Sequence, residues 1–340
     1  MYKKLKKILL KINKSKKTKC FFLGNTTKVE KSSFYISDLR ENNKFIFASV
    51  IIYDDLSAKK ISKIIDGKVD YILVDTEKKV LSKDKKKIVN LEKNVKATVT
   101  KSEIFTYKGN DLTVDSADTF INNYFIKDIR GVGGKKILIL GSGNIGFKLA
   151  LKLVESGANV FLYRRSKKIL DNIIKSINYI KPKGTIAKAE KLKQISNNLN
   201  NFDAIIGTTN GKAVLTLNHI KKFAVDSILL DIGKGILKKD ALEYGINNGL
   251  KFFRLDITPA YFGYLENISS TKKLSRTGVF KTMLNKEFTL AHKGILTKKN
   301  TLIVDSLNNP KKVFGVSDGF GGYKKLNLKQ IKLIEKKIKI

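Results

Sequence analysis

The stretch KKILILGSGNIGFKLALKLVESGANVFLYRRS, residues 135–166, carries the clearest chemical signal in the sequence. Its loop has the spacing G-x-G-x-x-G, follows an apolar run typical of a strand and opens an apolar-periodic helix, which is the context the motif requires. In such a loop the first glycine permits a tight turn, the second lets the backbone approach a pyrophosphate, and the third lets the helix pack on the sheet. The predicted dinucleotide-binding residues are Gly141, Ser142, Gly143, Asn144, Ile145 and Gly146. An ordinary strand–turn–helix without a ligand is the alternative.

The end of the following strand indicates which nucleotide this loop would take. Dehydrogenases that use NAD place an acidic residue there, which accepts hydrogen bonds from the ribose 2′-hydroxyl. Here the strand ends in Arg164, Arg165 and Ser166, and the first acid is Asp171. Two guanidinium groups and a hydroxyl suit a 2′-phosphate, which a carboxylate would repel. The sequence therefore predicts NADP rather than NAD.

Composition limits the classes of protein that this chain can belong to. Its 340 residues correspond to about two domains at roughly 150 residues each. The one cysteine excludes a disulfide framework, and two histidines argue against a histidine-rich metal centre, so we expect no metal. There is no apolar run long enough to span a membrane and no secretory leader, and the expected location is the cytoplasm.

The formal net charge of +38 is the other conspicuous property of the composition. Such a charge favours nucleic acid or an anionic membrane as partners, but only six of the 68 basic residues are arginine. We interpret most of the charge as a lysine-rich solvated surface, with a small-molecule substrate and no nucleic acid as partner. Residues 1–19 can form an amphipathic helix, which would contact a membrane surface or pack on the protein itself. A homodimer is a further expectation.

Alternating strand-like and helix-like segments predict an α/β fold. The regular rhythm after residue 135 implies βαβ units and a Rossmann doubly wound parallel sheet, joined to a smaller N-terminal α/β domain and a C-terminal extension. In the extension, a helix is expected around Phe280–Phe288 and strands at Thr301–Val304 and Val313–Val316. The predicted divisions are a basic segment (1–19), an N-terminal substrate domain (20–114), a connecting helix (115–134), an NADP-binding domain (135–256) and an extension that packs on the N-terminal domain or a partner (257–340).

Several motifs together resemble the shikimate dehydrogenase group of NADP enzymes. They are Asp118-Thr119 before a helix, GGKKILILGSGNIG, YRRSKK, FDAIIGTTN (202–210) and LLDIGKG (229–235). Methylenetetrahydrofolate dehydrogenases and glutamyl-tRNA reductases share some of them. The resemblance implies a substrate domain followed by a Rossmann domain, with a strand end near the nicotinamide and the next strand with its loop beside it. Those two loops add four residues to the expected cofactor site: Thr208, Thr209, Asp231 and Gly233.

The same resemblance implies a catalytic pair. The segment NVKATVTK ends in Lys101, and Asp118 begins the Asp-Thr motif. The lysine would polarise a carbonyl and shuttle the proton, and the aspartate would orient the substrate and the lysine. Asp115 is a rival to Asp118. Other candidates, each with a purely structural alternative, are Lys234, His219, His292, Tyr261 and Tyr264.

These observations predict an NADP-dependent dehydrogenase or reductase that acts on a small hydroxylated or carbonyl metabolite in an interdomain cleft. One alternative is a dehydrogenase of the methylenetetrahydrofolate type. The other is a non-catalytic dinucleotide-binding module with a basic surface for nucleic acid or membrane.

Overall fold

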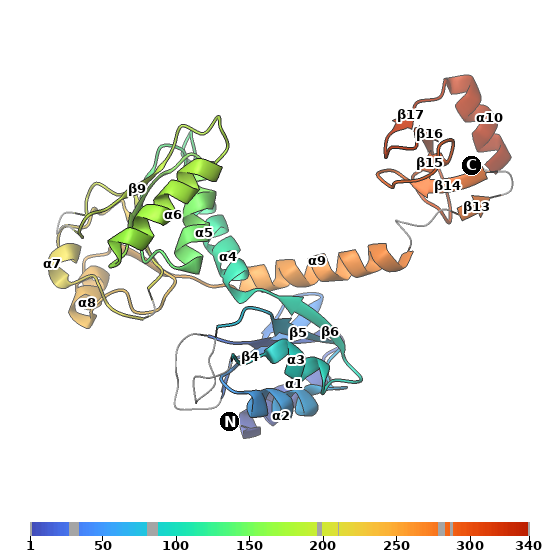
Figure 1. The fold of residues 1–340 in the computed structure, drawn as a ribbon. Helices are drawn as coiled ribbons and strands as arrows, with labels where there is room; N and C mark the ends of the chain where they lie inside the picture. Colours follow the sequence, from blue (N-terminus) through green and yellow to red (C-terminus); the bar gives the residue numbers. More distant parts are fainter. Residues whose placement is uncertain are drawn as a thin grey trace. The chain divides into compact units, whose positions relative to one another are not determined.

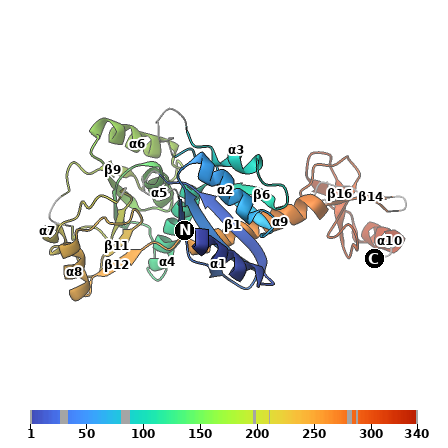
Figure 2. The same ribbon diagram turned by 90° about the horizontal axis from the view of Figure 1, so that it is seen from below.

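The computed structural model describes residues 2–26, 34–79, 88–195, 199–209, 211–277, 283–285 and 288–338. The chain divides into two compact units, Met1–Phe262 and Gly263–Ile340 (Figures 1 and 2). Among the described helices, none combines the length and the apolar character that a membrane crossing needs.

The first half of the first unit is built on a sheet with the order β2-β4-β1-β5-β6, in which β3 also pairs with β4. Strands β4, β1, β5 and β6 run parallel, so their carboxyl ends meet at one edge. Strands β2 and β3 are antiparallel to β4. The strands are β1 (Thr18–Gly24), β2 (Phe34–Ile36), β3 (Arg40–Glu41), β4 (Phe45–Ile52), β5 (Tyr71–Asp75) and β6 (Glu103–Tyr107).

Three helices cover one face of this sheet: α1 (Tyr2–Asn13), α2 (Asp55–Ile65) and α3 (Leu91–Lys96) (Figure 1). The apolar stripe expected in residues 1–19 forms on α1, and its members Leu5, Ile8, Leu9 and Ile12 are buried in this core. Helix α1 is therefore a packing helix of its own domain. Helix α2 begins where Asp54 accepts a hydrogen bond from the Ser57 backbone N–H, which satisfies one of its free amide groups.

The other face of the sheet carries an aromatic cluster. Phe22 packs edge-on against Phe47, Tyr107 and Tyr261, with ring centroids 4.5 to 5.2 Å apart. Phe262 packs against Phe47 in the same way. Tyr261 and Phe262 belong to the first turns of α9 (Thr258–Thr277), so the start of this helix covers the face that α1, α2 and α3 leave open.

The connecting helix differs from its prediction. Helix α4 runs from Gly109 to Tyr124, so it begins six residues before the expected start at Asp115 and ends ten residues before Gly134. Its first turn is capped from a distant loop, because the backbone N–H of Asn110 donates to Glu77 Oε2 over 2.8 Å. This cap comes from tertiary structure, so the local sequence around residue 109 does not reveal it. Asp115 consequently lies inside the helix and is not a cap.

The second half of the first unit contains a fully parallel sheet with the order β12-β11-β10-β7-β8-β9. This is the Rossmann order, in which the direction of strand addition reverses between β7 and β10. The predicted fold class is confirmed. Its strands are β7 (Lys136–Leu140), β8 (Asn159–Tyr163), β9 (Ala189–Lys191), β10 (Ala204–Gly207), β11 (Ile228–Asp231) and β12 (Lys251–Arg254).

Both faces of this sheet are covered, as a parallel sheet requires. On one face, alternate strand residues such as Ile137 and Ile139 pack with α4, α5 (Asn144–Glu155) and α6 (Lys167–Ile180). On the other face, Leu138 and Leu140 pack with residues in and near α7 (Leu217–Ile220) and α8 (Lys239–Asn247). Side chains alternate along each strand, so every strand contributes to both cores.

The second unit contains a sheet with the order β13-β14-β15-β16-β17 and the helix α10 (Leu328–Ile338). The helix predicted around Phe280–Phe288 is wrong where the structure describes it, because Met283–Asn285 pairs as a strand with β14. Residues 280–282 and 286–287 of that prediction lie outside the described residues. The strands are β13 (Met283–Asn285), β14 (Phe288–His292), β15 (Leu302–Val304), β16 (Val313–Ser317) and β17 (Tyr323–Lys324).

Candidate functional site

The glycine loop between β7 and α5 has the backbone that its sequence predicts. Gly141 adopts a φ of +101°, which side-chain-bearing residues rarely adopt, and its N–H donates to the Tyr163 carbonyl. A Cβ on Gly146 would lie 2.1 Å from the Gly141 carbonyl oxygen, so the helix passes too close to the loop for any side chain there. A Cβ on Gly143 would meet nothing within 4 Å, and this glycine is the N-cap of α5. The helix N-terminus is therefore open to a ligand.

Thr208 and Ser142 shape this loop from two sides. Thr208 follows β10, and its hydroxyl donates to the Gly141 carbonyl, which ties the two strand ends at the switch point together. Ser142 is 1% exposed, and its hydroxyl has no hydrogen-bond partner among the described residues. A buried polar atom without a partner costs free energy. The site therefore contains one hydroxyl that a bound phosphate oxygen could satisfy.

The predicted 2′-phosphate residues adjoin the same loop. Arg164 is half-buried, and its Nη1 donates to the Ser142 carbonyl over 2.6 Å. Arg165 and Ser166 are exposed, and the Ser166 side chain makes no capping hydrogen bond at the start of α6. One guanidinium thus anchors the strand end to the glycine loop, and the other cation and the hydroxyl face solvent beside it.

The loop after β11 closes against the turn after β10. A Cβ on Gly233 would lie 1.8 Å from the Thr209 carbonyl oxygen, so only glycine permits this approach. Asp231 holds the loop in shape, because its Oδ2 accepts from the Gly235 N–H over 2.6 Å. A pocket at this edge of the sheet is lined by Thr208, Thr209 and Gly233 but not by Asp231. Asp231 therefore supports the predicted cofactor site rather than lining it.

This pocket has a volume of about 370 Å³ and lies where the carboxyl ends of the two sheets face each other, and a second pocket beside it extends to Gly143 and Asn144. Both pockets are formed within the first unit. They have in common residues of the glycine-loop half and of the N-terminal half: Asn25, Thr26, Ile51, Lys79, Asn110, Ile145, Thr208, Ile232, Gly233 and Lys234. The dinucleotide loop and the N-terminal sheet thus open into one connected cavity.

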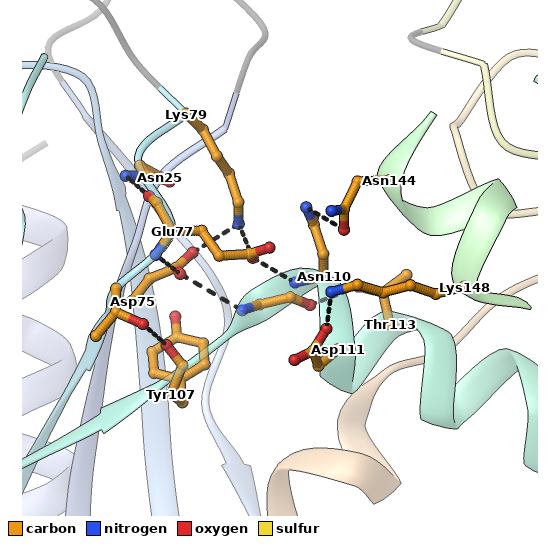
Figure 3. A network of polar contacts seen from close by, with 12 residues as sticks. Asn25, Asp75, Glu77, Lys79, Tyr107, Asn110, Asp111, Thr113, Asn144 and Lys148 are labelled. Atoms are coloured by element: carbon orange, nitrogen blue, oxygen red, sulfur yellow. Dashed lines mark hydrogen bonds and ion pairs between the residues drawn. The ribbon is translucent and has the colours of Figure 1, made fainter. Parts of the chain in front are cut away.

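An ion cluster from the loop after β5 projects into this cavity (Figure 3). Lys79 Nζ lies 2.7 Å from Asp75 Oδ2 and 2.8 Å from Glu77 Oε2. The side chains of Lys79, Asp75 and Glu77 are 12%, 2% and 14% exposed, so the cluster is largely screened from bulk water. An ammonium group has three N–H donors. The two carboxylates accept from two of these N–H groups. Among the described residues nothing accepts from the third, which is therefore available to a ligand.

Amide side chains connect this cluster to the glycine-loop helix. Asn25 is 5% exposed, and its Nδ2 donates to the Glu77 carbonyl over 3.0 Å. Asn110, in the first turn of α4, donates through Nδ2 to Asn144 Oδ1 over 3.2 Å (Figure 3). Lys148 of α5 pairs with Asp111 of α4 one turn further on. The ion cluster and the glycine loop are thus held by two helices that contact each other directly.

Two tyrosines form the apolar wall of the cavity. Tyr107 and Tyr261 both line it, and their hydroxyls form a hydrogen bond. Burial, together with the nearby charge of Asp75, raises the pKa of Tyr261 to about 12. Burial and the neighbouring Tyr261 and Asp75 raise the pKa of Tyr107 as well. Both phenols therefore stay protonated at neutral pH.

The structure does not bring together the predicted catalytic pair. Lys101 precedes β6 and is exposed at the amino-terminal edge of the sheet, opposite the cavity. Asp118 lies in the interior of α4, where it accepts from Asn122 Nδ2 over 3.0 Å and pairs with Lys152. Neither residue lines the cavity. The matched segment places its lysine at the start of a parallel strand and not at the end, so the catalytic role of this pair stays a prediction that the placement does not support.

The remaining candidates divide between the cavity and structural positions. Lys234 lines the cavity, with a φ of +62° that is unusual for a lysine. His219 accepts from the Thr216 N–H in a capping box, and burial lowers its pKa. Asp115 pairs with Lys152 on α5. His292 ends β14, and Tyr264, whose pKa partial burial raises, lies in α9; both belong to the second unit.

Sequence reasoning missed the residues that the N-terminal half contributes to the cavity and its ion cluster: Asn25, Arg40, Asp75, Glu77, Lys79 and Tyr107. A signal for some of them was present. Asp75, Glu77 and Lys79 come directly after the apolar strand YILV, and open parallel sheets collect ligands at the carboxyl ends of their strands. Applying that rule to both sheets, rather than to the second alone, would have found the cluster. No group of His, Cys, Asp or Glu suited to a metal ion occurs among the described residues.

Neither a family model nor a curated protein sequence matches the chain. Among solved structures, a dipicolinate synthase chain from Bacillus halodurans matches with 14% identity and a TM-score of 0.38, over 76% of this chain and 98% of that one. L-tryptophan dehydrogenase from Nostoc punctiforme matches with 11% identity and a TM-score of 0.38, over 60% and 56%. Shikimate 5-dehydrogenase from Listeria monocytogenes matches with 16% identity and a TM-score of 0.32, over 46% and 55%. The likeness to the shikimate dehydrogenase group stays a prediction.

Proposed function

We propose that this protein is an NADP-dependent oxidoreductase that reduces or oxidises a small carbonyl or hydroxyl compound. One observation carries the proposal: the N-terminus of α5 and the Lys79 cluster open into the same cavity, one from each sheet. The first is suited to a pyrophosphate, and the second offers a hydrogen-bond donor to a reacting oxygen.

The residues present fit a bound dinucleotide. Gly143 leaves open space at the N-cap, Gly146 keeps the helix close to the loop, and the buried hydroxyl of Ser142 lacks a partner among the described residues. Arg164, Arg165 and Ser166 support NADP, because no carboxylate stands at this strand end. When bound, NADP supplies the hydride acceptor or donor.

The chain's own contribution to the reaction centres on Lys79. Asp75 and Glu77 fix its ammonium group from two sides, so its direction is set before a substrate enters. A fixed donor stabilises the negative charge that develops on a carbonyl oxygen during reduction, because it needs no reorganisation at that moment. The two buried tyrosines of the cavity wall limit the access of water on their side of the cavity. In this proposal Lys79 takes the role that the sequence assigned to Lys101.

Thermal unfolding with NADPH, NADP and NADH tests the cofactor assignment. A ligand that binds only the folded state stabilises it by about 2.7 kcal/mol at one hundred times its Kd, so NADPH should raise the unfolding midpoint by several degrees and NADH by much less. A screen of carbonyl compounds that follows the absorbance of the reduced nicotinamide then tests for turnover.

Three results would contradict the proposal. The absence of any shift with all three nucleotides would exclude the dinucleotide site. Binding of NADPH without turnover on any carbonyl compound, or turnover confined to folates, would favour one of the two alternatives: a non-catalytic binding module or a dehydrogenase of the methylenetetrahydrofolate type.

A further inference from the structure

Arginine is scarce in this chain, and two arginines line the pocket. Lysine supplies 62 of the 68 basic residues, so a surface that needs only positive charge uses lysine here. Arg164 and Arg165 adjoin the glycine loop, and two further arginines, Arg40 and Arg254, line the 370 Å³ pocket. Two of the six arginines therefore line this pocket, and two more adjoin the glycine loop. Arginine differs from lysine in its planar fork of donors, which matches the two oxygens of a carboxylate.

Arg40 enters the pocket from the N-terminal sheet. It is half-buried, and its guanidinium donates only a long hydrogen bond, 3.5 Å, to the Asp38 carbonyl among the described residues. Among the described residues, no carboxylate forms an ion pair with the Arg40 guanidinium within 4 Å. Its charge nevertheless reaches the pocket, because it helps to lower the pKa of Asp256 and opposes the rise in the pKa of Tyr261.

Arg254 enters the same pocket from the Rossmann sheet. It ends β12 at the carboxyl edge, in register with Asp231 of β11. Within the described residues it has neither a hydrogen bond nor an ion pair from its side chain. Lys79, in contrast, is already engaged by two carboxylates. Arg40 and Arg254 are therefore the two arginines of the pocket, and neither forms an ion pair with a carboxylate of the described residues.

Asp256 also lines this pocket, and it is satisfied locally. Its Oδ1 accepts from the Thr258 N–H over 2.9 Å and from the Thr258 hydroxyl over 2.6 Å. Burial raises the pKa of Asp256, but these hydrogen bonds and the charge of Arg40 more than offset that effect and lower it. Asp256 thus remains charged, and its hydrogen bonds go to Thr258 and not to the two arginines, whose donors stay open to an anion.

We infer that the substrate carries a carboxylate group, held between Arg40 and Arg254 while its carbonyl or hydroxyl faces Lys79. This inference rests on the proposed function and narrows it from a small carbonyl or hydroxyl compound to a small oxo or hydroxy acid. The forked donors favour a planar carboxylate, and the size of the pocket limits the acid to a small one.

Binding of simple acids to the full chain saturated with NADPH tests this inference. The probes are oxalate, malonate, succinate and pyruvate, with oxamide, malonamide and succinamide as uncharged counterparts and inorganic phosphate as a second anion. Kd is measured by calorimetry for the natural chain and for Arg40→Gln, Arg254→Gln and Arg130→Gln. Arg130 lies outside the pocket and is the matched control.

At least one acid should bind at least tenfold more tightly than its amide. Each of the two pocket substitutions should weaken that acid about tenfold or more and leave the NADPH affinity within about twofold, because a charge-assisted hydrogen bond is lost. Equal binding of acids and amides, no binding of any acid, an unchanged Kd in either variant, or a preference for phosphate would overturn the inference. If the natural chain did not bind NADPH at all, the proposed function would be overturned instead. The failure of the inference and the failure of the proposed function are therefore distinguishable.

Discussion

Asn110 donates through its side-chain amide to Asn144 over 3.2 Å, which joins the first turn of α4 to the first turn of α5. The backbone N–H of the same Asn110 donates to Glu77, a member of the Lys79 cluster. The helix that would receive the pyrophosphate and the loop that carries the cationic donor are therefore linked through one residue. This linkage fixes the position of the Lys79 ammonium group relative to the glycine loop before any ligand binds.

The glycines of the loop should respond differently to alanine. Gly143→Ala places its methyl group in open space, so the free energy of unfolding should change by less than about 1 kcal/mol. The same methyl group occupies the space through which a pyrophosphate approaches, and NADPH binding should weaken at least tenfold. Urea unfolding and NADPH titration measure the two effects separately.

Gly146→Ala is the matched comparison, because its methyl group would meet the Gly141 carbonyl oxygen at 2.1 Å. Here both properties should fall, with about 2 kcal/mol or more lost from the free energy of unfolding as α5 shifts away from the sheet. If Gly143→Ala retained full NADPH affinity, the loop would not be the pyrophosphate site.

Replacing Arg164 and Arg165 by alanine should separate the two nicotinamide cofactors. A 2′-phosphate loses its charge-assisted hydrogen bonds, so the Kd for NADPH should rise by about two orders of magnitude. The Kd for NADH should change only slightly, since NADH has no phosphate at that position. Calorimetry with both nucleotides measures the ratio.

The single variants refine this test. Arg164 also donates to the Ser142 carbonyl, so its loss should disturb the glycine loop and weaken both nucleotides to some extent. Arg165 is exposed, and its loss should affect NADPH alone. Equal losses for NADPH and NADH in the double variant would refute the assignment of NADP.

The sequence predicts much of the Rossmann half of this fold. Its apolar runs predict strands at Lys136–Leu140 and Asn159–Tyr163 and its periodicity a helix at Lys167–Ile180, and β7, β8 and α6 have these bounds because local periodicity and turn residues determine such βαβ units. The glycine loop was equally predictable, since its chemistry resides in six consecutive residues. The start of α4 was not, because its cap is Glu77, which lies 33 residues away.

The N-terminal side of the cavity escaped prediction for a related reason. The role of the Lys79 cluster depends on the neighbouring strands β1 and β6, because the ends of these strands place Asn25 and Tyr107 beside it. The motif match pointed to Lys101 as the catalytic lysine. Only the direction of β6 shows that this residue lies at the edge of the sheet opposite the cavity. The direction of a strand relative to a site is a property of topology and cannot be read from one segment.

Lys79→Met should be strongly destabilising as well as inactive. It leaves Asp75, 2% exposed, and Glu77 without their cation, and breaking a buried ion pair on one side costs about 3 kcal/mol or more. The double variant Asp75→Asn with Lys79→Met should recover a good part of that loss, because one buried charge is removed. Thermal unfolding of the natural chain and the two variants measures this.

The same pair of variants separates structure from function. Turnover, assayed with the substrate that the carbonyl screen identifies, should fall at least a hundredfold in both variants, although the double variant is the more stable. Recovery of activity together with stability would show that Lys79 only supports the fold.

The position of Lys101 gives a pH-dependent prediction. Asp66, directly after α2, accepts hydrogen bonds from the backbone N–H groups of Thr100, Lys101 and Ser102 and from the Thr100 hydroxyl. Burial alone would raise the pKa of Asp66, but these hydrogen bonds outweigh it and lower the pKa from 3.8 to about 2. The folded state therefore favours the charged carboxylate, and this contribution to stability is present above pH 3.8 and is lost as the pH falls through about 2.

Asp66→Asn should consequently lower the free energy of unfolding by about 1 kcal/mol at neutral pH. The difference between the natural chain and this variant should shrink progressively as the pH falls from about 4 towards 2, because protonation removes the same charge from the natural chain. Urea unfolding at a series of pH values measures the difference, with Asp38→Asn as the control, since its side chain is 89% exposed and its ion pair with Lys4 lies at the surface, where such pairs contribute little. A difference that stays constant down to pH 2 would show that the charge of Asp66 does not stabilise the loop that carries Lys101.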